Sequence, residues 1–156
     1  MRRRSSQLKD ISSLVKVMKS EPPRYLRLFQ IQCWPASQMV PNSTLALVSL
    51  IDAVEKWRGN DAEHIPEDKV VVVSNDGFSR CGVYCVTTSC IEQAYHREEV
   101  DVFQAVKTVR KNRTQLVASA TEYKYCYDVV LHYVLNYCRA AVVGEASPDC
   151  PDLGRM

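Results

Sequence analysis

Lys69-Val70-Val71-Val72-Val73-Ser74-Asn75-Asp76-Gly77-Phe78-Ser79-Arg80-Cys81-Gly82 is the stretch around which this chain is organised. Its four consecutive valines predict a short strand that is buried on both faces. A tight polar loop follows, and the run from Val83 to Gln93 predicts a helix. A strand, a loop and a helix N-terminus in this order form an anion cradle, because backbone N–H groups and the positive end of the helix dipole converge on one point. Arg80, at the far end of the loop, is placed to bind a phosphate through two parallel N–H donors.

The loop resembles the signature loop of protein-tyrosine phosphatases, which reads His-Cys, five loop residues, Arg, then Ser or Thr and Gly. Val73 stands at the His position, Ser74 at the nucleophilic Cys and Arg80 at the Arg. The family's cysteine reacts as a thiolate, with a pKa pulled below the free value of ~8.5. A serine hydroxyl ionises far too weakly for the same cradle to activate it, and no adjacent base is evident. The five residues between are Asn75, Asp76, Gly77, Phe78 and Ser79.

Asp76 is a second departure from the family pattern, which usually has a small neutral residue at this position. A carboxylate in the cradle repels an incoming anion at close range. We therefore expect weak anion binding, favoured by Arg80 and the helix N-terminus and opposed by Asp76.

A second motif, Trp34-Pro35-Ala36, resembles the family's mobile acid loop, a Trp-Pro-Asp whose Asp protonates the leaving tyrosine oxygen. It lies the family's usual distance ahead of the signature loop. The acid position is Ala36, and alanine carries no proton. General acid catalysis, typically worth ~10²–10⁴ in rate, is then absent.

A third motif, Leu116 to Tyr123, resembles the family's Val-Gln-Thr followed by Gln-Tyr. The glutamine that positions the hydrolytic water is Ala118 in this chain, and the second glutamine is Glu122. Ser119-x-x-Glu122 is also a capping box that starts a helix, and this interpretation of Glu122 is preferred over a chemical role.

Hydrophobic periodicity and capping residues predict the remaining elements. The expected elements are a strand at Tyr25 to Gln32 with Phe29 and Ile31 on one face, a helix from the Asn42-Ser43-Thr44 cap to Trp57 with Leu47, Ile51 and Val54 buried, a helix at Gly82 to Ala94 with Cys85 and Cys90 inside, a helix at Val100 to Arg110 with Val102, Val106 and Val109 on one face, and a last helix with Tyr123, Tyr127, Val130 and Val134 in the core. Arg58 to Asp68 is expected to be a surface loop.

The composition is that of an ordinary globular chain of one domain, with 46% hydrophobic and 24% charged residues among 156. A formal charge of +2 argues against a nucleic-acid partner. No apolar run approaches a membrane span and the start lacks an apolar signal region, so we expect a cytoplasmic chain. The seven cysteines form no CxxC, which favours buried thiols in a reducing compartment over a metal site. No cofactor is expected. His64, His96 and His132 are isolated, which favours surface or packing positions over catalysis. Arg2-Arg3-Arg4-Ser5 matches a kinase substrate, but a solvated chain end is the preferred interpretation.

The resemblance covers about Tyr25 to Tyr137 and implies an α/β fold with a phosphatase-like mixed sheet flanked by helices. It corresponds to the C-terminal part of the family's domain, as in a fragment, a splice product or a truncated gene model. The missing N-terminal part includes the loop that stacks on phosphotyrosine, and its loss should leave an exposed apolar patch. The expected organisation is an N-terminal extension at 1–24, the partial phosphatase-like domain at 25–140 and a loose tail at 141–156.

The run from Val100 to Arg110 resembles the Val-Asp-Val-Phe helix of receptor-type phosphatases, most closely their second domains and, among those, the MAM-bearing group. Three positions, Ser74, Ala36 and Ala118, then indicate a pseudophosphatase that acts by binding an active phosphatase domain in cis or in trans, or other signalling proteins. The parent protein would be a single-pass membrane receptor. Two alternatives stay open: a phosphotyrosine reader that retains Arg80, and a weak phosphatase that uses Ser74 or the nearby Cys81.

Overall fold

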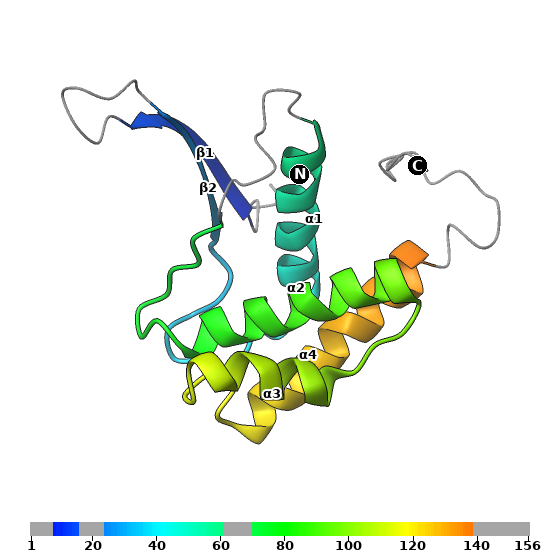
Figure 1. Ribbon diagram of the computed structural model, residues 1–156. Coiled ribbons are helices and arrows are strands. Elements are labelled where there is room, and N and C mark those ends of the chain that lie inside the picture. The colour runs from blue at the N-terminus through cyan, green and yellow to red at the C-terminus, as the bar shows by residue number, and fades with distance from the viewer. Residues whose placement is uncertain (1–7, 16–23, 61–69, 139–156) are drawn as a thin grey trace, which may run out of the picture.

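The computed structural model describes residues 8–15, 24–60 and 70–138. In this part of the chain a β-hairpin stands beside a group of helices (Figure 1). The elements in chain order are β1 (Leu8–Val15), β2 (Arg24–Ile31), α1 (Leu45–Asn60), α2 (Ser79–Arg97), α3 (Val102–Asn112), α4 (Ala120–Tyr133) and a π-helical turn, η1 (Val134–Cys138).

Helix α2 is the central element, because both α3 and α4 pack against it (Figure 1). Apolar and small residues occupy almost every side of its first four turns, which is the pattern of a helix surrounded by protein. Val83, Val86 and Cys90 are completely buried, and they meet Cys126 and Val129 of α4 in a single core cluster. The expected helix is therefore confirmed, with three more residues at each end.

Helix α1 is held against α4 by both packing and hydrogen bonds. Leu47, Ile51 and Val54 are buried, as the periodicity predicted. The Tyr125 hydroxyl donates to the backbone oxygen of Ser43 over 3.0 Å. Ser43 in turn accepts from the backbone N–H of Leu45 through its hydroxyl, so the expected polar cap of this helix is present. These contacts connect the start of α1 to the middle of α4.

The sheet in the described residues consists of β1 and β2, paired antiparallel from Leu8 opposite Ile31 to Val15 opposite Arg24. The expected strand at 25–32 is confirmed as β2, and Phe29 and Ile31 are both partly buried. Phe29 contacts Trp57 of α1 edge to face, with ring centroids 6.4 Å apart. The hairpin is thus attached to the helices through α1.

The valine run is not a strand in this structure, so the prediction of a strand buried on both faces is wrong here. Val71 and Val73 are 82% and 84% exposed, and Val70 is half exposed. Only Val72 packs against the core. A strand needs a neighbour to accept and donate its ladder hydrogen bonds, and no described segment pairs with these residues.

The fold class is therefore only partly as expected. The described residues are mostly helical, with one two-stranded antiparallel sheet in place of the mixed sheet that the resemblance implied. The helices that the resemblance placed around the sheet are present. The basic start, His64 and the tail at 141–156 lie outside the described residues.

The two last helices test the predicted buried faces. In α3, Val102 and Val106 are buried and Val109 is partly buried, as predicted. In α4, Val130 is buried as predicted, and Tyr123 and, just past the end of the helix, Val134 are partly buried against the core. The prediction is wrong for Tyr127, which is 45% exposed, and it missed the buried residues Tyr125, Cys126 and Val129. The apolar residues of α4 cover most of its circumference, so spacing alone does not select the buried stripe.

We predict that the exposed valines contribute little to folding and strongly to self-association. The double variant Val71→Thr/Val73→Thr should change the free energy of unfolding by no more than about 0.5 kcal/mol and should lower aggregation and dye binding to apolar surface. The matched control is Val83→Thr, which places a hydroxyl in the core and should cost about 1–3 kcal/mol. Equal losses in both variants, followed by chemical denaturation, would show that the valine segment is packed.

Candidate functional site

The signature-like loop folds around the carboxylate of Asp76. Its Oδ1 accepts hydrogen bonds from the backbone N–H of Phe78 over 3.0 Å and of Ser79 over 3.2 Å. Phe78 and Ser79 are the N-cap and the first residue of α2, and the Phe78 side chain provides no cap of its own. Asp76 therefore satisfies the free N–H groups at the start of α2, at the end of the helix where its dipole favours a negative charge.

The hydrogen bonds to Asp76 lower its pKa to about 2. The Ser79 hydroxyl is the largest contributor, and partial desolvation opposes it. The backbone N–H of Phe78, the Ser74 hydroxyl and the backbone N–H of Ser79 lower the pKa further. At neutral pH Asp76 is consequently a carboxylate that already occupies donors an incoming anion would need.

Ser74, at the position of the family's nucleophile, is also engaged inside the loop. Its hydroxyl donates to Asp76 Oδ1 over 2.9 Å and accepts from the backbone N–H of Gly77 over 3.1 Å. Cys81 Sγ lies 3.2 Å from the Ser74 hydroxyl oxygen and donates a hydrogen bond to it. Because the pKa of Asp76 is about 2, this carboxylate is a very weak base for the Ser74 proton.

Arg80 connects the signature-like loop to the segment Trp34-Pro35-Ala36, which resembles the family's acid loop. Its Nη2 donates to the backbone oxygen of Pro35 over 3.0 Å, and its guanidinium lies over the ring of Trp34, 5.2 Å from the centroid. Trp34 itself is buried and donates from Nε1 to the backbone oxygen of Gln38. Ala36 follows on an exposed stretch and brings no polar side chain to the site.

Arg113 is a site residue that the sequence did not reveal. It caps the end of α3, and its Nη1 donates to the backbone oxygen of Gly77 over 2.8 Å. Gly77 has a φ of 69°, in the left-handed region that favours glycine. No local pattern marks an arginine in a polar turn as a partner for a carbonyl 36 residues earlier.

The third motif lies against the first turn of α2, because Gly82 has no side chain. A Cβ at Gly82 would lie 2.9 Å from the backbone nitrogen of Val117, which is closer than packed atoms approach. Val117 adopts a φ of 52°, a strained conformation for a buried β-branched residue. Ala118, the next residue, is exposed.

Glu122 is 4% exposed and forms the predicted capping box. Its carboxylate accepts from the Ser119 backbone N–H over 3.1 Å, while the Ser119 hydroxyl accepts from the Glu122 N–H over 3.1 Å. The Glu122 carboxylate and the Ser119 hydroxyl thus accept hydrogen bonds from two backbone N–H groups at the start of α4.

The structure thus brings three separated segments of the chain to the signature-like loop and the first turn of α2. The acid-loop segment reaches it through Pro35, the 116–118 segment through Gly82, and the end of α3 through Arg113. Asn75 is exposed and Phe78 and Ser79 are half-buried around the loop. Within the described residues no group of three His, Cys, Asp or Glu side chains is arranged to hold a metal ion, and none of the helices there is long and apolar enough to cross a membrane.

The model of the protein-tyrosine phosphatase family matches residues 3–132 of this chain, a range that includes all of these loops. The chain belongs to the protein-tyrosine phosphatase family. Its relatives include receptor-type enzymes: it is 30% identical over 109 residues to receptor-type tyrosine-protein phosphatase U of Gallus gallus, 29% over 121 residues to the alpha type of Homo sapiens, and 32% over 114 residues to the S type of Gallus gallus.

These matches cover 70%, 78% and 73% of this chain and 7%, 14% and 7% of the relatives. The chain therefore spans a small part of each receptor-type protein that it resembles. The predicted likeness to receptor-type phosphatases is confirmed. The assignment to a second domain and to the MAM-bearing subgroup stays a prediction. The domain boundaries at 24 and 140 also stay predictions, and β1 lies within the expected N-terminal extension at 1–24.

We predict that Asp76 contributes stability above about pH 4 that disappears toward pH 2. A carboxyl group whose folded pKa, about 2, lies below its ordinary 3.8 stabilises the fold once ionised, and it loses this contribution as pH falls through the folded value. The stability difference between the native chain and Asp76→Asn should therefore shrink between pH 4 and pH 2, modestly because the loop is exposed. Denaturation at several pH values measures it.

Glu92→Gln is the matched control, because Glu92 is an exposed carboxylate of α2. Only a pH-dependent change that the Asp76→Asn difference shows and the Glu92→Gln difference does not is assigned to Asp76. A difference for Asp76→Asn that changes no more than that for Glu92→Gln would contradict the hydrogen-bonded position of Asp76.

Proposed function

We propose that this chain is a catalytically inactive, phosphatase-like module that acts by binding other proteins in tyrosine-phosphorylation signalling. The observation that carries the proposal is the position of Asp76, whose carboxylate occupies the start of α2 where the substrate's phosphate would have to bind. Residue identity adds to this geometry, since serine, alanine and alanine stand at the nucleophile, acid and water-positioning positions, namely Ser74, Ala36 and Ala118.

Hydrolysis at this site would lack each of its chemical steps. The Ser74 hydroxyl has only the weakly basic Asp76 beside it, so it is not activated as a nucleophile. Ala36 supplies no proton to a leaving group. Cys81 donates its hydrogen bond into the loop and is buried at 7% exposure, which disfavours it as a substitute nucleophile.

The same contacts weigh against a phosphotyrosine reader. Such a reader would need Arg80 and the loop N–H groups to face the ligand. Arg80 instead donates to Pro35 and stacks on Trp34, and the N–H groups of Phe78 and Ser79 donate to Asp76. A protein-binding role, to an active phosphatase domain in cis or in trans, uses outer surfaces of the module and does not require this loop to be free.

We predict no turnover of aryl phosphates or phosphotyrosine peptides by the purified 156-residue chain, because the nucleophile and the acid are both missing. Ser74→Ala serves as the control and should be indistinguishable from the native chain in a continuous phosphatase assay. Activity that survives repeated purification and disappears in Ser74→Ala would overturn the pseudophosphatase proposal.

We predict that the loop binds phosphate or tungstate weakly, and that Asp76→Ala tightens binding by about tenfold or more by freeing two N–H donors and removing a negative charge. Arg80→Ala should then abolish the gain. Calorimetric titration with tungstate measures both. Asp52→Ala removes a remote carboxylate of α1 and controls for the change in net charge. An equal effect of Asp52→Ala and Asp76→Ala would show that Asp76 does not block the loop.

A further inference from the structure

Helix α3 and the segment before it carry an exposed stripe that is acidic at one end and basic at the other. Glu98 and Glu99 precede the helix, and Lys107, Arg110 and Lys111 lie in its second half. All five are exposed, and among the described residues none of them forms an ion pair. On α1 and α4, by contrast, Lys56, Arg58 and Lys124 are each paired with a carboxylate of their own helix.

The stripe also exposes apolar side chains between its two charged ends. Phe103 is 57% exposed and Val100 is 39% exposed. Charges of these signs at the ends of a helix are favoured by its dipole, and Asp101 caps α3 by accepting from the Gln104 N–H. The dipole does not account for an exposed phenylalanine between the charges, and exposed aromatic residues are enriched where proteins bind one another.

We propose that this stripe, Glu98 to Lys111, is a docking surface for a second copy of the same chain. In a two-fold symmetric interface the same patch faces itself, so its charges must complement one another when one copy is reversed. Two α3 helices that lie antiparallel, with the axis near Ala105, bring the acidic connection before one helix, with Glu98 and Glu99, toward Lys111 at the basic end of the second copy. The same arrangement places Phe103 opposite Lys107 of the second copy, where a cation over an aromatic ring is favourable.

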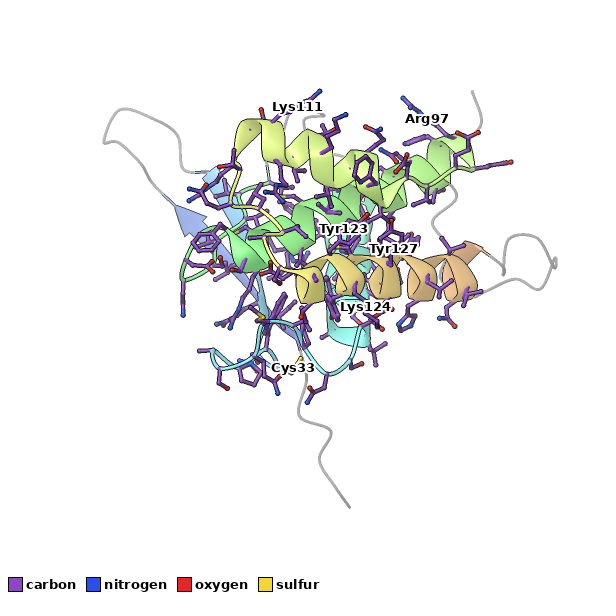
Figure 2. All side chains as sticks on the ribbon, turned by 90° about the horizontal axis from the view of Figure 1, so that it is seen from below. Cys33, Arg97, Lys111, Tyr123, Lys124 and Tyr127 are labelled. Carbon is purple, nitrogen blue, oxygen red and sulfur yellow. The ribbon has the colours of Figure 1, made fainter. Side chains whose placement is uncertain are left out.

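The orientation of the stripe suits this contact. Ala105 and Val106 face the core, so the opposite side of α3, which carries Lys107 and Lys111, points outward. Figure 2 shows Lys111 and Arg97 at the edge of the molecule formed by α3 and the end of α2, away from Lys124 on α4. Arg97 offsets one of the negative charges at the acidic end. A single pair of short helices buries a small area, so the dimer is weak and transient.

Sedimentation equilibrium of the full chain over a wide concentration range, at low and at high ionic strength, tests the proposal. We expect a monomer–dimer equilibrium that weakens with added salt, because exposed charge pairs are screened. Lys111→Glu and Glu99→Lys should each weaken the dimer by about tenfold or more, since each reversal acts twice in a two-fold interface. The double variant Glu99→Lys/Lys111→Glu should restore it.

Lys124→Glu is the matched control, because it reverses an exposed lysine outside the stripe and should leave the association unchanged. Circular dichroism of each variant establishes that the helices are retained. A chain that stays monomeric at low salt, or association that the reversals at positions 99 and 111 leave unchanged, overturns the proposal.

Binding of a poly-glutamate peptide tests the alternative that the stripe binds an acidic partner protein and not a second copy of the chain. If this peptide binds through Lys107 and Lys111 and the chain itself does not dimerise, the stripe serves an acidic partner and the second-copy proposal is wrong.

Discussion

The hydrogen bonds between the Asp76 carboxylate and the first N–H groups of α2 connect the fold of this chain to its function. Helix α2 is the element against which α3 and α4 pack, and its N-cap residue, Phe78, has no polar side chain to cap it. Asp76 supplies the cap from two residues earlier. The contact that starts the central helix is therefore also the contact that takes the loop's donors away from a phosphate, and one side chain accounts for both effects.

The contacts that bring the loops together do not involve the side chains at the positions of the family's nucleophile, acid and water-positioning residues. The side chains of Arg80 and Arg113 donate hydrogen bonds to the backbone oxygens of Pro35 and Gly77, respectively. Gly82 allows the backbone of Val117 to approach α2 closely. Such contacts depend on a guanidinium or on the absence of a Cβ, and not on the identity of the residues they reach. The positions of these loops therefore do not depend on which side chains stand at positions 36, 74 and 118.

The sequence predicted local features well and features that depend on distant chain poorly. The buried stripe of α1 and the Ser119–Glu122 capping box follow from spacing and side-chain chemistry within a few residues, and both are present. The valine run carries a strong strand signal, but whether it forms a strand depends on a partner segment. The burial of Tyr125 likewise depends on distant residues, because its ring contacts Trp34 and its hydroxyl donates to the backbone oxygen of Ser43.

The candidate site shows the same division. The resemblance predicted Ser74, Arg80, Trp34 and Ala118 as site residues, and the structure brings Arg80 onto Trp34. Arg113 was not predicted, because its partner is a backbone carbonyl 36 residues away. The sequence indicated that Asp76 opposes anions through its charge. The structure adds a more direct cause, since Asp76 also uses the hydrogen-bond donors, and only the folded loop reveals which donors those are.

The thiol of Cys81 lies 3.2 Å from the Ser74 oxygen, so it would be the nearest neighbour of a cysteine placed at position 74. A Ser74→Cys reversion would set two sulfur atoms in contact, and a thiolate beside a second thiol is readily oxidised to a disulfide. Under mildly oxidising conditions the introduced thiol at position 74 would then form a disulfide with Cys81. A cysteine at position 74 would therefore form a redox-sensitive pair with Cys81, and the two thiols would have to be kept reduced for either to react as a nucleophile.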